Sequence, residues 1–337
     1  MSPVPPMNAA LRATLDPLVP LIYGRDDVVE VSLNGPGDLW VEIAGRGYEK
    51  MDGAGLDLAW SRDLCDQLKN LFKRPYDPNR FPLLASPLPG GHRLQAVLGA
   101  NTRSGMVLSI RVQRHKSFDF SDFGLLPGRP VEGGAAYRAA RFDSGHPIGS
   151  VEDLEAVVAA ELPVLVSGGT NSGKTNFLKR LLRCVRSDRR VVTVEDVEEL
   201  VVAQPNQAGL LAEESQTGTA VEPMHLLKAV LRLNPSVAVP GEQQLENTLP
   251  SYRLLNTGHS GWMSTIHADS PLDALEAWRT NMTMALKSAA AADAALPVLV
   301  RKIARIVQLS EQRKVVEIVR PADLPWRELI GRSGGAG

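Results

Sequence analysis

The sequence predicts a two-domain chain: a smaller α+β domain followed by an α/β domain with a mainly parallel sheet. Its 337 residues are enough for about two domains with full hydrophobic cores. In the second half, short apolar runs alternate with helix-like stretches, which is typical of parallel strands joined by crossover helices. In the first half, strand-like runs are joined by short turns, which favours antiparallel pairing.

The composition is that of an ordinary folded protein. The formal net charge is −1, so no overall positive field favours binding to nucleic acid. The N-terminus lacks the basic start and apolar run of a secretion signal, and no apolar stretch is long enough to cross a bilayer. The only two cysteines, Cys65 and Cys184, are expected to be core residues in a reducing compartment. We therefore expect a cytoplasmic protein whose membrane contacts are made through partners.

The N-terminal domain is expected over residues 1–115. Residues 11–27 predict an amphipathic helix broken by Pro17 and Pro20, and helical periodicity returns over residues 56–73. Strand-like runs, separated by turn residues, lie at residues 28–34, 39–43, 84–88, 93–98 and 106–112. These elements predict a mostly antiparallel sheet covered by helices.

A glycine- and proline-containing linker is expected over residues 116–150, followed by the α/β domain over residues 151–330 and a frayed tail over residues 331–337. The expected strands of this domain are residues 164–167, 190–194, 237–239 and 263–266, with a hairpin of 304–309 and 315–319. The expected helical stretches are residues 151–160, 174–185, 224–233, 245–255, 271–284 and 289–303.

The strongest local pattern follows the strand expected at residues 164–167. It is a G-x-x-x-x-G-K-T sequence made by Gly168, Gly169, Thr170, Asn171, Ser172, Gly173, Lys174 and Thr175, with Asn176 next. A strand, a glycine-rich turn and a helix in this order are the context of a phosphate-binding loop. Backbone amides and the helix N-terminus would face a phosphate chain, Lys174 would reach the outer phosphates, and Thr175 could ligate Mg²⁺. A chance glycine-rich loop is the alternative.

Charged and imidazole side chains stand at the ends of other expected strands. Glu195 and Asp196 end one strand, and Glu242 ends another. Such a carboxylate can take a proton from water or hold Mg²⁺, although acidic residues at strand ends are often only helix caps. His259 and His267 flank a third strand, where an imidazole can hydrogen-bond a terminal phosphate or be merely structural. These groups fit nucleotide hydrolysis.

Together these motifs resemble those of the hexameric secretion-ATPase superfamily, in particular its type IV secretion and conjugation branch. Type II secretion and tight-adherence pilus ATPases are also similar. The matching stretches are residues 29–42 and 88–95 for the N-terminal domain, 192–200 for the aspartate box and 256–271 for the histidine box. Several motifs in the same order make this resemblance more specific than a phosphate-binding loop alone.

The resemblance implies an ATP-hydrolysing hexameric ring, in which each subunit has an N-terminal sheet domain and a RecA-like motor domain. ATP and Mg²⁺ would bind between the two domains. By motif position, Glu242 would be the catalytic carboxylate, Glu195 would belong to the aspartate box and His267 to the histidine box. Family members also bring N-terminal arginines onto the outer phosphates, and Arg93 and Arg111 are the matching positions. A surface arginine is the alternative for each.

The resemblance also implies partners. They are other copies of the chain and the inner-membrane components of a secretion or conjugation channel, so the protein would act at the cytoplasmic face of the inner membrane. No stable binding of nucleic acid is expected.

Several positions depart from the family's pattern. They are Asn171, Asn176, Pro240, Gln243-Gln244 and Trp262. Asn171 replaces a glycine in a loop that requires φ > 0 if the usual conformation holds, and asparagine tolerates this region better than most residues. Gln244 stands where the family usually has an arginine, so an expected cation near Glu242 is missing. We expect these departures to affect turnover more than nucleotide binding.

Two other functions stay open. A nucleotide-binding structural ring subunit with little hydrolysis is favoured by the Gln243-Gln244 departure. A nucleic-acid motor such as a hexameric helicase shares the RecA-like core, but the nearly neutral charge and the lack of a basic stripe argue against it.

Overall fold

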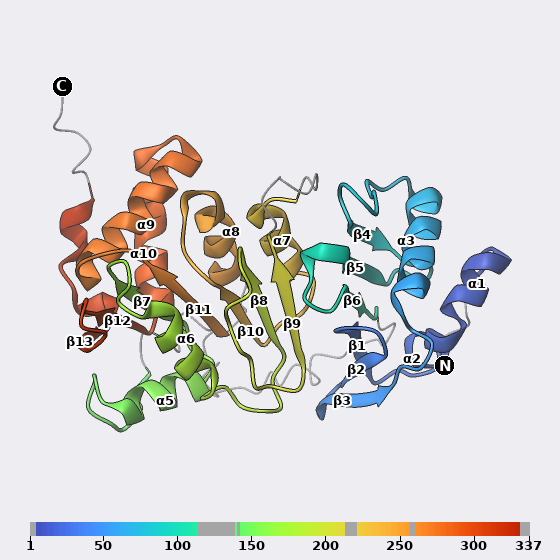
Figure 1. Cartoon of the computed structure of the whole chain (residues 1–337), viewed down its shortest axis with the longest axis horizontal. Coiled ribbons are helices and arrows are strands. Elements are labelled where there is room, and N and C mark those ends of the chain that lie inside the picture. Colours follow the sequence, from blue (N-terminus) through green and yellow to red (C-terminus); the bar gives the residue numbers. More distant parts are fainter. Residues whose placement is uncertain (1–4, 114–138, 140–141, 213–220, 257–260, 331–337) are drawn as a thin grey trace, which may run out of the picture. The chain divides into compact units, whose positions relative to one another are not determined.

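The computed structural model describes residues 5–113, 139, 142–212, 221–256 and 261–330. They form two compact units, one built from the N-terminal part of the sequence and one from the C-terminal part (Figure 1). Most of the expected linker, residues 116–150, and the whole expected tail, residues 331–337, lie outside the described residues. The domain limits therefore stay predictions. Within the described ranges, no helix is both long and apolar enough to span a membrane.

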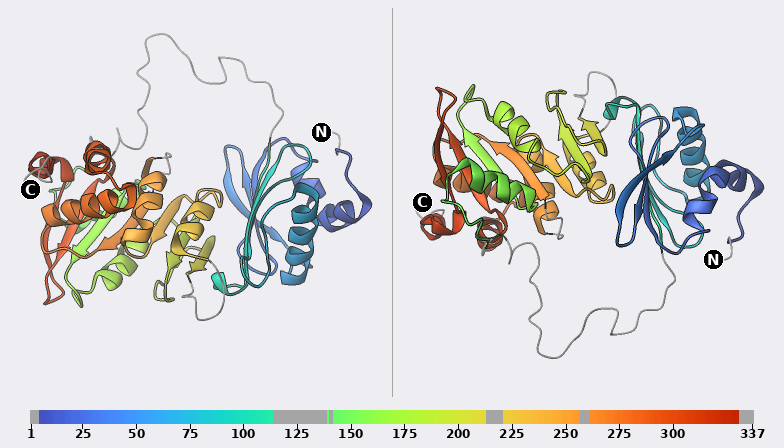
Figure 2. Two further views of the ribbon diagram at one scale, coloured as in Figure 1. Left: turned by 90° about the horizontal axis from the view of Figure 1, so that it is seen from above. Right: turned by 90° about the horizontal axis from the view of Figure 1, so that it is seen from below.

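The first unit is a six-stranded antiparallel sheet with helices on one face (Figures 1 and 2). Its strands, in spatial order, are β3 (Gly47–Asp52), β2 (Asp38–Ile43), β1 (Val28–Leu33), β6 (Met106–Arg111), β5 (Arg93–Leu98) and β4 (Leu83–Pro87). Its helices are α1 (Ala9–Leu15), α2 (Val19–Ile22) and α3 (Leu58–Phe72). Apolar side chains from both layers, such as Leu11, Leu64 and Leu108, form one core. The α+β prediction is confirmed.

Capping residues and prolines set the helix limits in this unit. The Asn8 side chain accepts a hydrogen bond from the Leu11 amide at 2.8 Å at the start of α1. Asp57 accepts from the Trp60 amide at 2.8 Å at the start of α3. The broken helix expected near the N-terminus consists of α1, a 3₁₀ turn at Asp16–Leu18 and α2, because each proline stands at the start of a new piece.

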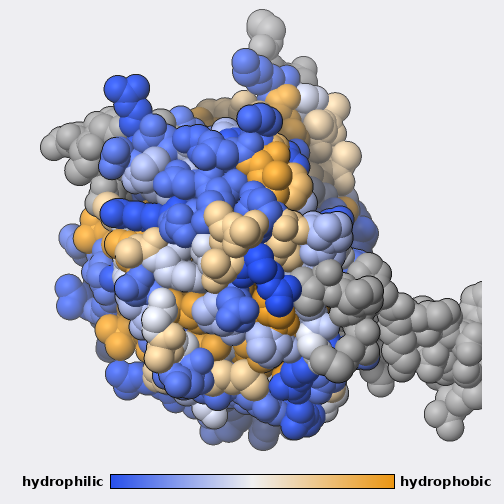
Figure 3. All heavy atoms as spheres, turned by 90° about the vertical axis from the view of Figure 1, so that its right-hand side faces the viewer, coloured by the Kyte–Doolittle hydropathy of each residue, from blue (hydrophilic) through white to orange (hydrophobic). Residues whose placement is uncertain are grey.

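The surface shown in Figure 3 mixes hydrophilic and hydrophobic side chains.

The second unit is a seven-stranded sheet. One edge strand, the last in the sequence, runs antiparallel to its neighbour, and the other strands are parallel. Its strands, in spatial order, are β13 (Val315–Val319), β12 (Arg305–Leu309), β7 (Val164–Gly168), β11 (Gly261–Ile266), β10 (Val237–Pro240), β8 (Val191–Glu195) and β9 (Gln207–Leu211). The pairs from β12 to β9 are parallel, whereas β12 and β13 form an antiparallel hairpin. The expected mainly parallel α/β domain is confirmed.

Helices cover both faces of this sheet (Figure 2). They are α5 (Val151–Ala159), α6 (Lys174–Leu182), α7 (Pro223–Val230), α8 (Leu245–Asn256), α9 (Pro271–Leu286) and α10 (Ala289–Lys302). The pair α5 and α6 lies on one face, and α8, α9 and α10 lie on the other. Because both faces are covered, the central strands are buried along their whole length and mostly apolar, as in Val164–Gly168 and Val191–Glu195.

Two strands, β3 and β9, lie outside the sequence-based prediction. Both are edge strands. The sequence of β3 is Gly-Tyr-Glu-Lys-Met-Asp, with no buried residue and no apolar alternation. β9 is short and contains Gly209, which lowers strand propensity. The edge strands β4 and β13 were predicted, so the edge position alone does not account for the difference; β3 and β9 lack the apolar run from which a strand is predicted.

A fully buried ion pair fastens α5 to the sheet. Arg305, at the start of β12, donates from Nε and Nη2 to the two carboxylate oxygens of Asp153 at 2.7 and 2.6 Å, and both side chains are 0% exposed. Ser144 Oγ donates to the same carboxylate at 2.6 Å. Burial alone would raise the pKa of Asp153, but the hydrogen bonds from Arg305 and Ser144 outweigh it and lower the pKa.

Replacing Asp153 by alanine leaves the Arg305 guanidinium buried without its counter-charge. We expect the free energy of unfolding to fall by about 3–5 kcal/mol, measured by urea unfolding followed by circular dichroism. The exposed pair Arg186–Asp188, 2.6 Å apart, provides the control: Asp188→Ala should cost less than about 1 kcal/mol. Equal losses in the two variants would contradict the structural role of Asp153.

The lowered pKa of Asp153 also determines the direction in which the stability of the fold changes with pH. The stabilisation from the Asp153 carboxylate is present above its unfolded pKa of about 3.9 and is lost as the pH falls through the lower folded pKa. The difference in stability between the wild type and Asp153→Ala should therefore shrink on acidification.

Candidate functional site

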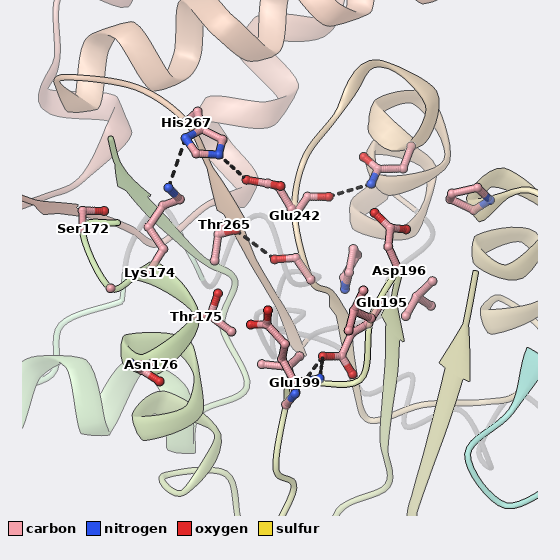
Figure 4. Close-up of a pocket in the computed structure, with 18 of the residues that line it drawn as sticks. Ser172, Lys174, Thr175, Asn176, Glu195, Asp196, Glu199, Glu242, Thr265 and His267 are labelled. Carbon is pink, nitrogen blue, oxygen red and sulfur yellow. Dashed lines mark hydrogen bonds and ion pairs between the residues drawn. The ribbon is translucent and has the colours of Figure 1, made fainter. Parts of the chain in front are cut away.

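The carboxyl ends of four parallel strands, β7, β8, β10 and β11, surround a pocket of about 490 Å³ (Figure 4). Such an edge is where open α/β sheets bind ligands. Nine of the predicted site residues line it: Asn171, Ser172, Gly173, Lys174, Thr175, Asn176, Glu195, Glu242 and His267. Asp196 lines it as well. The fold thus brings together side chains that are far apart in the sequence.

The glycine-rich loop joins β7 to α6 at one wall of this pocket. Gly173 precedes the first residue of α6 with φ +86°, and it provides no side chain to cap the helix. The first amides of α6 are therefore not capped by the residue before the helix, which favours an anion at this end. Asn171 has φ +63°, so the expectation that this position requires the left-handed region is confirmed. At Gly168 a Cβ atom would lie 2.4 Å from Ser172 Oγ, so a larger residue does not fit there without a shift.

The ammonium group of Lys174 is the centre of the site. Its side chain turns back over the loop and donates to the carbonyl oxygens of Gly168 and Gly169 at 2.9 and 2.8 Å. Its third contact is with Nδ1 of His267 at 3.2 Å. Burial lowers the pKa of Lys174, and the negative charge of Glu242 opposes this shift. The loop therefore holds a cation over its own carbonyl groups.

His267 connects this cation to the Glu242 carboxylate (Figure 4). Its Nε2 lies 2.8 Å from Glu242 Oε1. A lysine ammonium can only donate, so Nδ1 of His267 accepts from Lys174 and the ring proton is on Nε2. The neutral imidazole then donates to Glu242. The three side chains form one hydrogen-bonded row across the pocket.

The backbone around Glu242 is fixed by β8 and β11. Pro240 has no amide proton, but the next residue, Gly241, donates to the Val194 carbonyl at 2.9 Å and continues the pairing with β8. On the other side, Glu242 forms a bridge with Thr265 of β11, and the Thr265 hydroxyl donates to the Gly241 carbonyl at 2.9 Å. The departure at Pro240 thus leaves the position of the carboxylate supported from both sides.

Gln243 and Gln244 take up different roles beside Glu242. Gln243 is buried and donates from Nε2 to Ser264 Oγ at 2.8 Å. Gln244 is exposed, and its Nε2 lies 3.3 Å from Glu242 Oε2. The position expected to hold a cation therefore gives the carboxylate a neutral hydrogen bond. The other departure, Trp262, is buried in β11 against Trp278 of α9, with ring centroids 5.6 Å apart.

Glu195 lies at the pocket wall but is also committed to the backbone. Its Oε1 accepts from the amides of Glu199 and Leu200 at 3.0 and 2.7 Å. This oxygen therefore holds the loop after β8 in place. Thr175, at the first turn of α6, presents a hydroxyl at the pocket. Among the described residues no three His, Cys, Asp or Glu side chains gather as a metal site.

The other predicted residues lie elsewhere. Gly168 ends β7, and Gly169 and Thr170 belong to the loop but do not line the pocket. Arg93 and Arg111 are in the first unit, directly opposite each other on β5 and β6, and both are exposed. Residues 257–260, which include His259, lie outside the described residues.

Arg313 lines the pocket and is a charged residue that was not among the sequence-based candidates. It lies in the turn between β12 and β13, and a lone arginine in a turn carries no motif. A positional signal does exist: this turn follows the carboxyl end of a strand parallel to β7, so it lies at the same edge of the sheet as the glycine-rich loop.

The sequence and fold match known proteins. A family model described as "Type II/IV secretion system protein" matches residues 149–326. Protein VirB11 of Rhizobium radiobacter is 32% identical over 277 residues, covering 76% of this chain and 77% of the relative. Type IV secretion system protein PtlH of Bordetella pertussis is 32% identical over 281 residues, covering 81% of each. A putative conjugal transfer protein of Mycobacterium tuberculosis is 30% identical over 262 residues, covering 75% of this chain and 69% of the relative.

Among solved structures, the VirB11 ATPase from the Brucella suis type IV secretion system matches with a TM-score of 0.79 and 21% identity, covering 95% of this chain and 99% of that chain. This match supports the fold. The family model spans more than half of the chain, and the VirB11 and PtlH relatives extend the likeness into the first unit. The chain therefore belongs to the family of type II/IV secretion system proteins.

Proposed function

We propose that this chain is an ATPase that powers a type IV secretion or conjugation apparatus. The observation that carries the proposal is the row of Lys174, His267 and Glu242 across a pocket that starts at a glycine-rich loop. It joins a phosphate-binding cation to a carboxylate suited to act on water. Membership of the secretion family and the names of the VirB11, PtlH and conjugal-transfer relatives support the choice of apparatus.

Binding of ATP would exchange the partners of Lys174. Its ammonium is hydrogen-bonded to two loop carbonyls and His267. A phosphate chain along the loop amides offers charged oxygens, which form stronger hydrogen bonds with an ammonium than carbonyl oxygens do. Thr175 fits a Mg²⁺ ligand because its hydroxyl faces the pocket beside Lys174. Bound Mg²⁺ would neutralise phosphate charge, and Glu195 is the second residue proposed near it.

Glu242 is proposed as the general base. Its side chain is 32% exposed at the pocket, so its carboxylate is accessible to a water molecule and can accept the proton of that water. His267 donates to the same carboxylate and orients it. If Lys174 exchanged His267 for a phosphate, the hydrogen bonding of His267 would change. Phosphate binding would in this way be coupled to Glu242, the proposed base.

The motor action follows from the family resemblance. We propose a homohexameric ring in which Mg-ATP closes the N-terminal domain onto the motor domain and phosphate release reopens it. Arg93 and Arg111 would reach the outer phosphates in the closed state and neutralise charge on the transferred phosphoryl group. Inner-membrane components of the secretion channel would receive this motion.

A second candidate is a nucleotide-binding ring subunit with little hydrolysis. It is favoured by Gln244, which gives Glu242 a neutral contact at 3.3 Å where the family usually has a cation. In this case the pocket would bind nucleotide to hold the ring together, and Glu242 would turn over slowly.

Replacing Glu242 by glutamine should lower kcat for ATP hydrolysis by about 10²–10⁴-fold and leave Mg-ATP binding nearly unchanged. The amide oxygen can still accept the hydrogen bond from His267, so the local structure is kept. Phosphate release and calorimetry measure the two effects. Glu246→Gln, an exposed acid in the first turn of α8, is the matched control. Loss of binding in Glu242→Gln would mean that its role is wrongly assigned.

Replacing Lys174 by alanine should weaken Mg-ATP binding by more than about tenfold, because a charged hydrogen bond to phosphate is lost. Steady-state phosphate release should fall to background. Lys179→Ala, on the same helix but outside the pocket, should behave as the wild type. If phosphate release does not differ between Lys174→Ala and the wild type while binding is intact, the structural ring subunit is the better description.

Replacing Arg111 by alanine should lower hydrolysis by about tenfold or more while the ring still assembles, as measured by phosphate release and analytical ultracentrifugation. Arg80→Ala, another exposed arginine of the first unit, is the control. A variant that only dissociates would identify Arg111 as a residue of the subunit interface.

A further inference from the structure

Arg313 is held against the glycine-rich loop by the hairpin that follows β12. The turn is closed by backbone hydrogen bonds of 2.9 Å from Ser310 to Lys314 and from Arg313 to Ser310. Arg313 itself has φ +60°. The methylene stem of its side chain covers Gly173: a Cβ atom on that glycine would lie 3.6 Å from Arg313 Cγ. The arginine is therefore positioned on the loop, and it lines the pocket.

The guanidinium group of Arg313 has no hydrogen bond or ion pair with any residue in the described part of the chain. Two buried arginines of this unit have a carboxylate partner. Arg305 is paired with Asp153, and Arg279 is paired with Asp293. A guanidinium carries five donors that suit phosphate oxygens and a planar face that can stack on a base. Arg313 thus presents unused donors and charge to the pocket.

The order of the strands shows which end of a nucleotide this cation can meet. In the sheet, β12 lies on one side of β7, while β11, β10 and β8 lie on the other (Figure 1). Glu242 and His267 follow β10 and β11, so they flank the loop on the side opposite to Arg313. A triphosphate bound on the loop with its terminal phosphate toward Glu242 has its nucleoside end toward the β12 side.

We propose that Arg313 binds the α-phosphate and nucleoside end of the nucleotide. The proposal rests on the proposed function, because it takes the pocket to hold a nucleoside triphosphate with its terminal phosphate beside Glu242. It assigns to Arg313 a binding role that Lys174 does not cover, since Lys174 acts on the outer phosphates. Nucleotide affinity, and not the chemical step, is then the property that Arg313 controls.

The test compares Arg313→Met with Lys314→Met in the full chain. Methionine keeps an unbranched stem over Gly173 and removes the charge, whereas Lys314 is the neighbouring exposed cation and does not line the pocket. Calorimetry with Mg-ADP and, in the Glu242→Gln background, with Mg-ATP should show both nucleotides bound about tenfold more weakly by Arg313→Met. Saturating kcat should stay within about twofold, and Lys314→Met should match the wild type.

Two results would overturn the inference. In one, Mg-ATP binding weakens, Mg-ADP binding does not, and kcat falls, which would place Arg313 on the terminal phosphate. In the other, Arg313→Met and Lys314→Met bind both nucleotides as the wild type does. Failure of the wild type itself to bind Mg-ADP or Mg-ATP would instead refute the proposed function.

Arg313→Lys separates two forms of the contact. Recovery of the affinity by lysine indicates a charge contact to the α-phosphate, because an ammonium keeps the charge. No recovery indicates stacking of the planar guanidinium on the base, which lysine lacks. Either result supports the inference.

Discussion

The parallel pairing of β7 with β11 is the constraint on which the site depends. Ser167 lies opposite Ile266 in this register, so the residues that follow, the glycine-rich loop and His267, leave the sheet side by side. The bridge between Glu242 and Thr265 then ties the end of β10 to β11. A slip of one residue would exchange the two faces of the strand and separate His267 from Lys174. The arrangement of these side chains is thus set by main-chain pairing within the sheet.

The Lys174 ammonium is costly to bury, and its three hydrogen-bond partners among the described residues are groups that a phosphate can replace. Two of them are carbonyl oxygens of the loop itself, and the third is His267. Neutral acceptors compensate a buried cation less well than an anion does, so this arrangement favours anion binding. The same ammonium also fixes the tautomer of His267 and hence the hydrogen bond received by Glu242. The proposed phosphate-binding cation and the proposed base therefore belong to one hydrogen-bond network.

Much of the fold could be predicted because the central strands are buried on both faces and read as apolar runs, as in β7 and β8. The glycine-rich loop could be predicted because the spacing of its glycines, lysine and threonine after a strand is typical of a phosphate-binding loop. Strands β3 and β9 could not, because β3 has no buried residue and β9 is a short run that contains Gly209. At the site, the sequence indicated that Glu195 ends a strand but not that its Oε1 accepts two backbone amides. Arg313 reaches the loop only through the pairing of β12 with β7, which no local pattern encodes.

The buried pair of Trp262 and Trp278 gives the second unit a built-in optical reporter. Trp262 belongs to the strand that ends just before His267, and its indole is 1% exposed against the Trp278 ring. Tryptophan emission depends on the polarity and contacts around the ring, so a displacement of β11 relative to α9 would change the fluorescence of the unlabelled protein. Emission from this buried pair would therefore report movement at the His267 end of β11.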